Sequence, residues 1–226
     1  MKNIQQILVL IFACLCWTIQ AHGQVAPSAT ELAKYDGLHA AAHEGDTVRI
    51  KSLIGSGADL KQTDGRGRTA LHVAAFASHD NVVEALAGAG ADPNQQENDK
   101  YDIITIAAVA NDADMVRTAV NAGGDAKNIT SIYGGTALIA AAHLGNWESV
   151  QVLIEAGAPL DHVNNLGWTA LIEAVVLGDG GPRHVKTARL LVKAGADRSI
   201  ADRTGNTPLE LARKLGYEEM IRALTP

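Results

Sequence analysis

The sequence predicts an all-α protein built as an array of stacked helical repeats, and three observations lead to this fold class. A motif of small and aliphatic residues returns about every 33 residues, a glycine motif keeps step with it, and aromatic residues make up only 4% of the 226-residue chain. A core with so few large rings has to close-pack small side chains, and alanine-rich helices at short range do this. The hydrophobic share of 47% is too high for a disordered chain.

Residues 1–23 are predicted to be a secretory signal peptide and not part of the array. Lys2 gives a basic start, residues 7–17 form an unbroken apolar run, and Ala21 and Gly23 supply small residues before a cut. Eleven apolar residues are too few to span a bilayer as an ordinary helix, which disfavours an uncleaved anchor. We expect cleavage after Gly23 or, alternatively, after Ala21, and hence a periplasmic or secreted protein without a stable membrane anchor.

The composition of the remaining chain excludes several kinds of site. Both cysteines, Cys14 and Cys16, lie in the segment that would be removed, so no disulfide and no cysteine metal site is expected. The formal net charge is −6, and no run of Lys or Arg occurs. This charge pattern argues against a surface for nucleic acid or anionic lipid.

Residues 24–34 are expected to form a leader that caps the array. Ser28 followed by Glu31 fits a capping box for a short helix. The repeats then begin at residue 35, and we place their boundaries at 35–63, 64–96, 97–129, 130–163, 164–201 and 202–226. The shortened last unit is expected to be the second cap.

The repeated motif is easiest to see in the first two units. Leu38-His39-Ala40-Ala41-Ala42 recurs 33 residues later as Leu71-His72-Val73-Ala74-Ala75. Its further copies begin, in order, at Ile104, Leu138, Leu171 and Leu209. The matching glycine motif begins at Gly57, Gly90, Gly123, Gly157 and Gly195. Each unit is therefore predicted to be a helix, a turn, a second helix and a long turn.

The second unit supports this interpretation in detail. Thr69 is a natural N-cap for a first helix, and an apolar stripe at helical spacing follows it. A second stripe begins at Val82 and ends at Gly90, which can adopt the left-handed C-terminal cap. One unit cannot bury its own faces, so stacking of neighbouring units has to supply the core.

Two stretches resemble the ankyrin repeat: Asp64-Gly65-Arg66-Gly67-Arg68-Thr69-Ala70-Leu71-His72-Val73-Ala74-Ala75 and Asp202-Arg203-Thr204-Gly205-Asn206-Thr207-Pro208-Leu209. The resemblance covers about residues 35–226. It implies an all-α solenoid of about six repeats including caps, with β-hairpin or loop fingers and a concave face that binds another protein. It also implies that His39 and His72 brace adjacent units by hydrogen bonds.

Two units depart from the pattern. In the third unit Asp102 stands where other units have Thr, and Lys100 stands where a glycine would ease the turn. The fifth unit has an insertion at residues 178–183 between its helices, which we interpret as a loop extension. This glycine-rich insertion resembles a loop of some bacterial ankyrin-repeat proteins, which favours a bacterial origin. With its predicted signal peptide, the chain resembles exported, periplasmic members of that group.

Scarce aromatic residues gather at positions that are variable and face the groove in the ankyrin family. Tyr101 and Trp168 directly precede a helix N-cap, Tyr133 lies on a finger, and Phe76 aligns with His143. Rigid aromatic side chains are common anchors of protein interfaces. We predict a partner-binding set, with the charged members as a polar rim, that consists of Arg66, Arg68, Phe76, Asp99, Tyr101, Tyr133, His143, Leu166 and Trp168.

Catalysis is the competing function class. His39 and His43 lie four apart on one helix and could reach one metal ion, but the sequence offers no third ligand and no nucleophile motif. We therefore predict no catalytic residue, no metal and no cofactor, and a monomer whose partner is another protein rather than nucleic acid. The alternatives are a secreted effector or inhibitor of a foreign protein and, less favoured, an enzyme that uses His39, His43 and His143.

Overall fold

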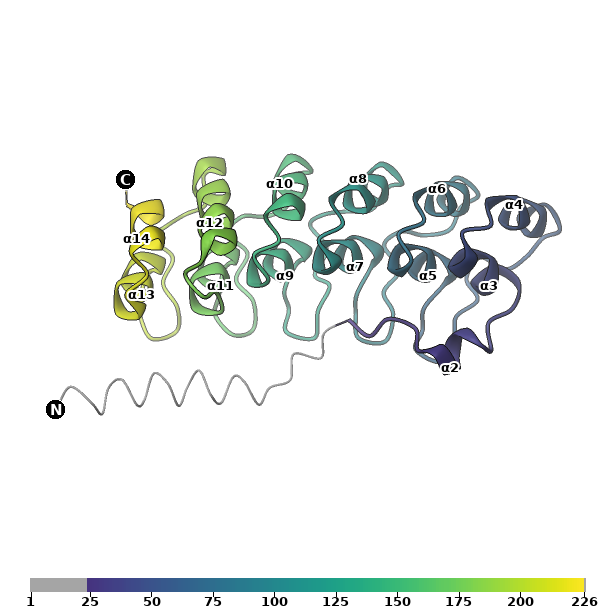
Figure 1. The fold of residues 1–226 in the computed structure, drawn as a ribbon, viewed down its shortest axis with the longest axis horizontal. Coiled ribbons are helices and arrows are strands. Elements are labelled where there is room, and N and C mark those ends of the chain that lie inside the picture. Colours follow the sequence, from purple (N-terminus) through teal and green to yellow (C-terminus); the bar gives the residue numbers. More distant parts are fainter. Residues whose placement is uncertain (1–23, 226) are drawn as a thin grey trace.

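The structure, a computed structural model, describes residues 24–225. These residues form thirteen α-helices and no strand, and the labels start at α2 (Figure 1). The helices are α2 (Ala29–Leu32), α3 (Gly37–Glu44), α4 (Thr47–Gly55), α5 (Ala70–Phe76), α6 (Asp80–Gly88), α7 (Ile103–Ala110), α8 (Ala113–Asn121), α9 (Ala137–His143), α10 (Trp147–Glu155), α11 (Ala170–Val176), α12 (Pro182–Ala194), α13 (Pro208–Leu215) and α14 (Glu218–Leu224). None of the helices in this part of the chain has the length and apolar character that crossing a membrane requires.

The helices stack in two layers along an elongated array (Figure 1). The odd-numbered helices α3 to α13 form the first layer and the even-numbered helices α4 to α14 form the second, with each helix packed on its neighbours in the same layer. Each unit from residue 35 onward contributes one helix to each layer. The prediction of an all-α array of stacked helix pairs is confirmed.

Alanine residues of the repeated motif form the centre of the first layer. Ala41, Ala74, Ala107 and Ala141 are fully buried. A methyl side chain lets neighbouring helices approach closely, and so the core needs few large rings. The N-caps expected from the sequence are also present, because Thr69 begins α5 and Asp102 begins α7.

Five loops join one unit to the next on the side of the first-layer helices, and we call them fingers A (62–69), B (95–102), C (128–136), D (162–169) and E (200–207). Of the two expected forms, β-hairpin or loop, the fingers take the loop, since this part of the chain has only one isolated antiparallel bridge, between Ile129 and Thr136. A side chain closes the turn instead. In finger A, Asp64 Oδ1 accepts the backbone N–H groups of Arg66 and Arg68 at 2.8 and 3.0 Å.

The same device recurs in other fingers. Asn164 in finger D and Asp202 in finger E each accept the N–H groups two and four residues later, and Glu97 does so in finger B. Polar side chains of this kind mimic a turn of the backbone. A finger closed in this way holds its shape without a ladder of strand hydrogen bonds.

Polar side chains at the start of second-layer helices brace each unit to the preceding one. The bonds run from His79 Nε2 to the His43 carbonyl (3.0 Å), from Asn146 Nδ2 to the carbonyls of Ala108 and Val109 (3.0 and 2.9 Å), from His184 Nε2 to the His143 carbonyl (3.0 Å) and from the Tyr217 hydroxyl to the Gly178 carbonyl (3.1 Å). The accepting carbonyls lie at the C-terminal end of a first-layer helix or just beyond it, where carbonyls lack a partner within the helix. The braces therefore satisfy the helix ends and join the units at the same time.

The insertion in the fifth unit lies between α11 and α12, as the sequence predicts. Part of it forms a loop and part lengthens α12, which has 13 residues where α10 has 9. Gly180 adopts a φ of +69°, and a Cβ atom at this position would lie 2.6 Å from the Tyr217 ring. Only glycine allows this close approach between the loop and the last unit.

Candidate partner-binding face

The nine residues predicted to contact a partner all lie on the fingers or at the ends of first-layer helices. Phe76 ends α5 and His143 ends α9, and both side chains are partly exposed. The other seven belong to fingers A to D. The prediction thus places its residues along one edge of the array, but the exposure of the individual side chains differs widely.

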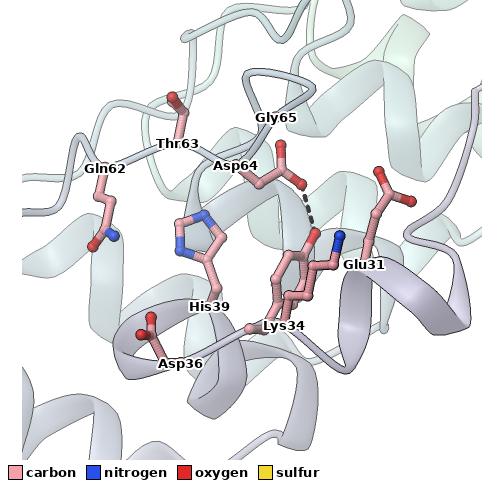
Figure 2. Close-up of a pocket in the computed structure, with 9 residues that line it drawn as sticks. Glu31, Lys34, Asp36, His39, Gln62, Thr63, Asp64 and Gly65 are labelled. Atoms are coloured by element: carbon pink, nitrogen blue, oxygen red, sulfur yellow. Dashed lines mark hydrogen bonds between the residues drawn. The ribbon is translucent and has the colours of Figure 1, made fainter.

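Arg68 does not lie on an exposed polar rim, and that part of the prediction is wrong. Its side chain is only 1% exposed. Its guanidinium donates to Asp64 Oδ2 and to Glu31 Oε1, both at 2.7 Å. Tyr35 donates its hydroxyl proton to the same Asp64 oxygen at 2.6 Å, the bond that is dashed at Asp64 in Figure 2. Arg68 is therefore the centre of a buried ionic network.

Ionisation of this network follows from its hydrogen bonds. Burial alone would raise the pKa of the Asp64 carboxyl, but the hydrogen bonds from Tyr35 and Arg68 outweigh it, and the pKa lies below its usual value. Burial and the bond to Asp64 raise the pKa of the Tyr35 hydroxyl. Asp64 thus carries its charge, and Tyr35 keeps its proton.

Tyr101 is also less accessible than predicted. Its side chain is 9% exposed and packs within the hydrophobic core, so the prediction of an exposed aromatic anchor at this position is corrected. Burial, together with the nearby charges of Asp99 and Glu97, raises the pKa of the Tyr101 hydroxyl. The residue precedes the N-cap Asp102, and this position turns its ring toward the core.

Arg66 and Asp99 are half-exposed and form an ion pair between fingers A and B. The Arg66 Nη1 atom lies 3.8 Å from Asp99 Oδ2, and its Nε atom lies 3.4 Å from Glu31 Oε1. Exposed pairs of this kind contribute little to stability. They give fingers A and B a charged surface.

Fingers C and D have a different character, because they carry no Asp, Glu, Lys or Arg. Ile129 is 53% exposed, Ile132 48%, Val163 47% and Leu166 37%, which makes four of the seven exposed large hydrophobic residues in the described part of the chain. We call these four residues the aliphatic patch. Tyr133 and Trp168, both partly exposed, lie on the same two fingers.

The two fingers are held side by side by hydrogen bonds. The backbone N–H of Asn165 donates to the Tyr133 carbonyl at 2.8 Å, and His162 Nε2 donates to the Gly134 carbonyl at 2.7 Å. The residues of the aliphatic patch therefore lie on two adjoining fingers. Sequence reasoning included Leu166 but missed Ile129, Ile132 and Val163.

A signal for the missed residues is present in the sequence. Ile129 and Val163 stand at the position that Thr63 holds in finger A and Gln96 holds in finger B. Large aliphatic residues are unusual in a turn that water surrounds, and where several gather they point to a contact surface. Comparing the fingers with one another would have found them.

A buried polar cluster lies beside the patch. Glu173 on α11 is 3% exposed, and its Oε1 atom accepts a hydrogen bond from Asn164 Nδ2 at 2.8 Å. Its Oε2 atom lies 3.3 Å from His143 Nδ1. Because Asn164 also closes the turn of finger D, its bond to Glu173 fixes the base of that finger, with His143 beside it. Sequence reasoning missed Glu173, the acidic residue within an otherwise apolar motif.

The other histidines have a structural arrangement. His39 Nε2 donates to the Arg68 carbonyl at 2.8 Å, which confirms the expected bracing of adjacent units by this residue. His39 also lines a pocket between the leader and finger A, together with Tyr35 and Asp64 (Figure 2). Across residues 24–225 the side chains form no group of three or more His, Cys, Asp or Glu that could hold a metal ion.

Comparisons with known proteins agree with this architecture. The family model described as ankyrin repeats in three copies matches residues 12–97 and 104–200. The ankyrin repeat protein YahD of Escherichia coli (strain K12) is 38% identical over 98 residues, which are 43% of this chain and 49% of YahD. The chain thus aligns with about half the length of that relative.

Two solved structures are similar over most of the chain. An ankyrin repeat domain from Acinetobacter baumannii AYE is 41% identical, with a TM-score of 0.77, and the match covers 83% of this chain and 95% of that one. The ankyrin repeat protein EF0377 is 31% identical, with a TM-score of 0.78, and the match covers 84% and 98%.

Proposed function

We propose, from the premise that this chain belongs to the ankyrin-repeat family, that it is an exported protein which binds another protein and catalyses no reaction. Ankyrin repeats are protein-binding modules, and this supports the general function. The finer proposal is that the partner binds the finger side of the concave face, centred on fingers C and D.

The aliphatic patch is the observation that carries this proposal. Contiguous exposed apolar surface mostly marks a contact site in a soluble protein. Interface centres are poor in charge and rich in aromatic residues, and fingers C and D combine four exposed aliphatic side chains with Tyr133 and Trp168 and with no charged residue. The charged fingers on either side then supply a polar rim, through Arg66 and Asp99 on one side and Arg203 on the other.

Matched substitutions test the site. Leu166→Asp and Ile132→Asp place a charge in the centre of the patch, whereas Val48→Asp places one on α4 in the second layer, where Val48 is 80% exposed. The protein captured from envelope extracts by the wild-type chain should bind the two patch variants at least about tenfold more weakly, since a desolvated unpaired charge costs well over 1 kcal/mol. Val48→Asp should bind like wild type.

The opposite pattern contradicts the proposal. If Val48→Asp abolishes binding while the patch variants retain it, the partner contacts the second layer. Circular dichroism on all three variants checks that they remain folded. Because each substituted side chain is exposed, we expect equal helix content.

Export is proposed from residues 1–23, which lie outside the described residues. The short apolar run and the small residues before the cut support it. N-terminal sequencing of the exported protein should find a chain that begins at Gln24 or at His22, and recovery of Met1 in a membrane pellet would contradict cleavage. Fractionation in the same experiment separates a resident envelope protein from one released to act on a foreign protein.

A further inference from the structure

The leader, residues 24–34, is bound to finger A through the arginines of that finger. Arg68 Nη1 donates to the Val25 carbonyl at 3.0 Å, and Arg68 Nη2 donates to Glu31 Oε1 at 2.7 Å. Arg66 Nε lies 3.4 Å from the same Glu31 oxygen. In Figure 1 the leader lies on the finger side of the array before it reaches α2 and the first unit.

Apart from these contacts the leader is weakly held. Helix α2 has no buried residue, and no residue of the leader is buried. Hydrophobic burial therefore contributes little to its docking. The polar contacts of Arg66 and Arg68 are the main attachment between the leader and finger A.

Glu31 is presented to the arginines in a fixed orientation. Its Oε2 atom accepts the backbone N–H and the hydroxyl of Ser28 at 2.8 and 2.6 Å, which forms the capping box predicted from the sequence, and its Oε1 atom faces Arg68 and Arg66. The bonds from Ser28, followed by the charge of Arg68, hold the pKa of the Glu31 carboxyl below its usual value. The leader thus offers an ionised carboxylate to a buried guanidinium.

Finger A has more positive than negative charge without Glu31. Within the finger Asp64 is the only acidic residue, against Arg66 and Arg68. Removing one partner of a buried ion pair is strongly unfavourable. When Glu31 moves away, the guanidinium of Arg68 loses the carboxylate that lies 2.7 Å from its Nη2 atom. Binding of another carboxylate at the same place would then be favoured.

We propose that finger A is a carboxylate-binding site that the leader fills within the same chain, and that an acidic segment of a protein partner fills it when the leader withdraws. The site is separate from the aliphatic patch on fingers C and D, and it does not depend on binding there. It takes a flexible segment with a glutamate close to a serine or threonine, as in the leader. An apolar segment has no group to offer Arg68.

A labelled peptide with the sequence of residues 24–36 serves as the probe, and fluorescence anisotropy measures its binding to the full chain. Wild type should bind it poorly, because the attached leader occupies the site at high effective concentration. Glu31→Ala in the protein should release the leader and raise the affinity for the peptide about tenfold or more. A peptide in which its own glutamate is replaced by alanine should bind neither protein.

Two further variants make the result specific. Arg66→Ala added to Glu31→Ala should lower peptide affinity again, and it leaves the buried Arg68–Asp64 pair intact. Glu44→Ala removes an exposed carboxylate that pairs with Arg49 on the surface, and it should behave like wild type. Trypsin should also cut after the exposed Lys34 faster in Glu31→Ala than in Glu44→Ala.

Two results would overturn the proposal. If Glu31→Ala lowers the melting temperature and still binds no peptide, the leader is a permanent cap and finger A is no binding site. If the peptide without glutamate binds as well as the original, the site does not recognise a carboxylate.

Discussion

At the residue scale, His72 helps to cap the N-terminus of α5, and its imidazole ring is buried. Its Nδ1 atom accepts the backbone N–H of Thr69 at 3.1 Å and pairs with the Thr69 hydroxyl at 2.8 Å. The ring is fully buried, and burial lowers its pKa to about 4, an effect that the neighbouring carbonyls of Tyr101 and Gln95 partly oppose. In the folded chain His72 therefore stays neutral down to about pH 4, whereas in the unfolded chain it takes up a proton near pH 6.5.

His72→Gln tests this linkage. Between pH 6.5 and pH 4 the unfolded state binds the proton and the folded state does not, so the free energy of unfolding of wild type should fall by about 3 kcal/mol as the pH is lowered through this window. Glutamine three residues after Thr69 can still close a capping box, but it has no proton to bind. Denaturant unfolding at pH 7 and pH 4.5 should thus show a smaller loss for His72→Gln.

The control for this measurement is His43→Gln, since His43 is exposed. Its stability should follow the pH dependence of wild type. Parallel curves for wild type and His72→Gln would show that the pH dependence has another source.

Lys100 carries backbone strain at one position of finger B. Its φ is +69°, and the matching positions of the other fingers are glycines with φ between +67° and +85°. A side chain in this left-handed region costs about 1 kcal/mol. Lys100→Gly should therefore raise the free energy of unfolding by up to about 1 kcal/mol. Lys100→Ala keeps the Cβ atom and should give no such gain in the same denaturant titration.

At the element scale, the braces between units account for the alignment of the second-layer helices. Asn146 begins α10 and is 4% exposed, and both bonds of its amide group reach carbonyls of the preceding unit. The side-chain oxygen Oδ1 of Asn146 in turn accepts a hydrogen bond from Arg183 Nη2 of the following unit at 2.8 Å. One side chain thus links three consecutive units.

Asn146→Ala removes these links and leaves buried polar groups without partners. We expect the free energy of unfolding to fall by about 1–3 kcal/mol. His79→Ala removes a brace that is partly exposed, where water can replace the ring, and it should cost less. Equal losses of unfolding free energy in the two variants would show that burial does not determine how much a brace contributes to stability.

The helices could be predicted from the sequence because their signals are local. Apolar spacing, an N-cap such as Thr69 before α5 and a glycine such as Gly90 after α6 each lie within one or two turns of the helix end that they mark. The shape of the fingers could not be predicted in this way, because a β-hairpin and a turn closed by Asp64 have similar sequences. The burial of Arg68 was also beyond reach, since its partner Glu31 lies 37 residues earlier in a segment without a repeat.

At the scale of the whole molecule, stability comes from packing between successive units. The buried alanines and the braces repeat along the array, and the described residues offer no cluster of metal ligands. We therefore expect that a chelator such as EDTA leaves the melting temperature unchanged, in a thermal scan followed by circular dichroism. A clear drop on adding chelator, restored by zinc, would revive the interpretation of His39 and His43 as metal ligands.

The edge that we propose for partner binding was partly predictable, because the repeat puts all fingers on one side. Which finger is apolar and which is charged depends on single residues such as Ile132 and Arg66, and their exposure depends on neighbouring units. The prediction therefore included Leu166, which the fold leaves exposed, and two residues, Arg68 and Tyr101, that the fold buries.

The braces have a mechanical consequence. They join residues 36 to 41 positions apart, so each unit is tied to its neighbours and not to distant parts of the chain. Tension applied to the two ends of the chain is therefore carried by every interface between units, one after another. Such a chain yields one repeat at a time, with each step releasing roughly 110 Å of extended polypeptide, and it can rewind from whichever repeats remain intact.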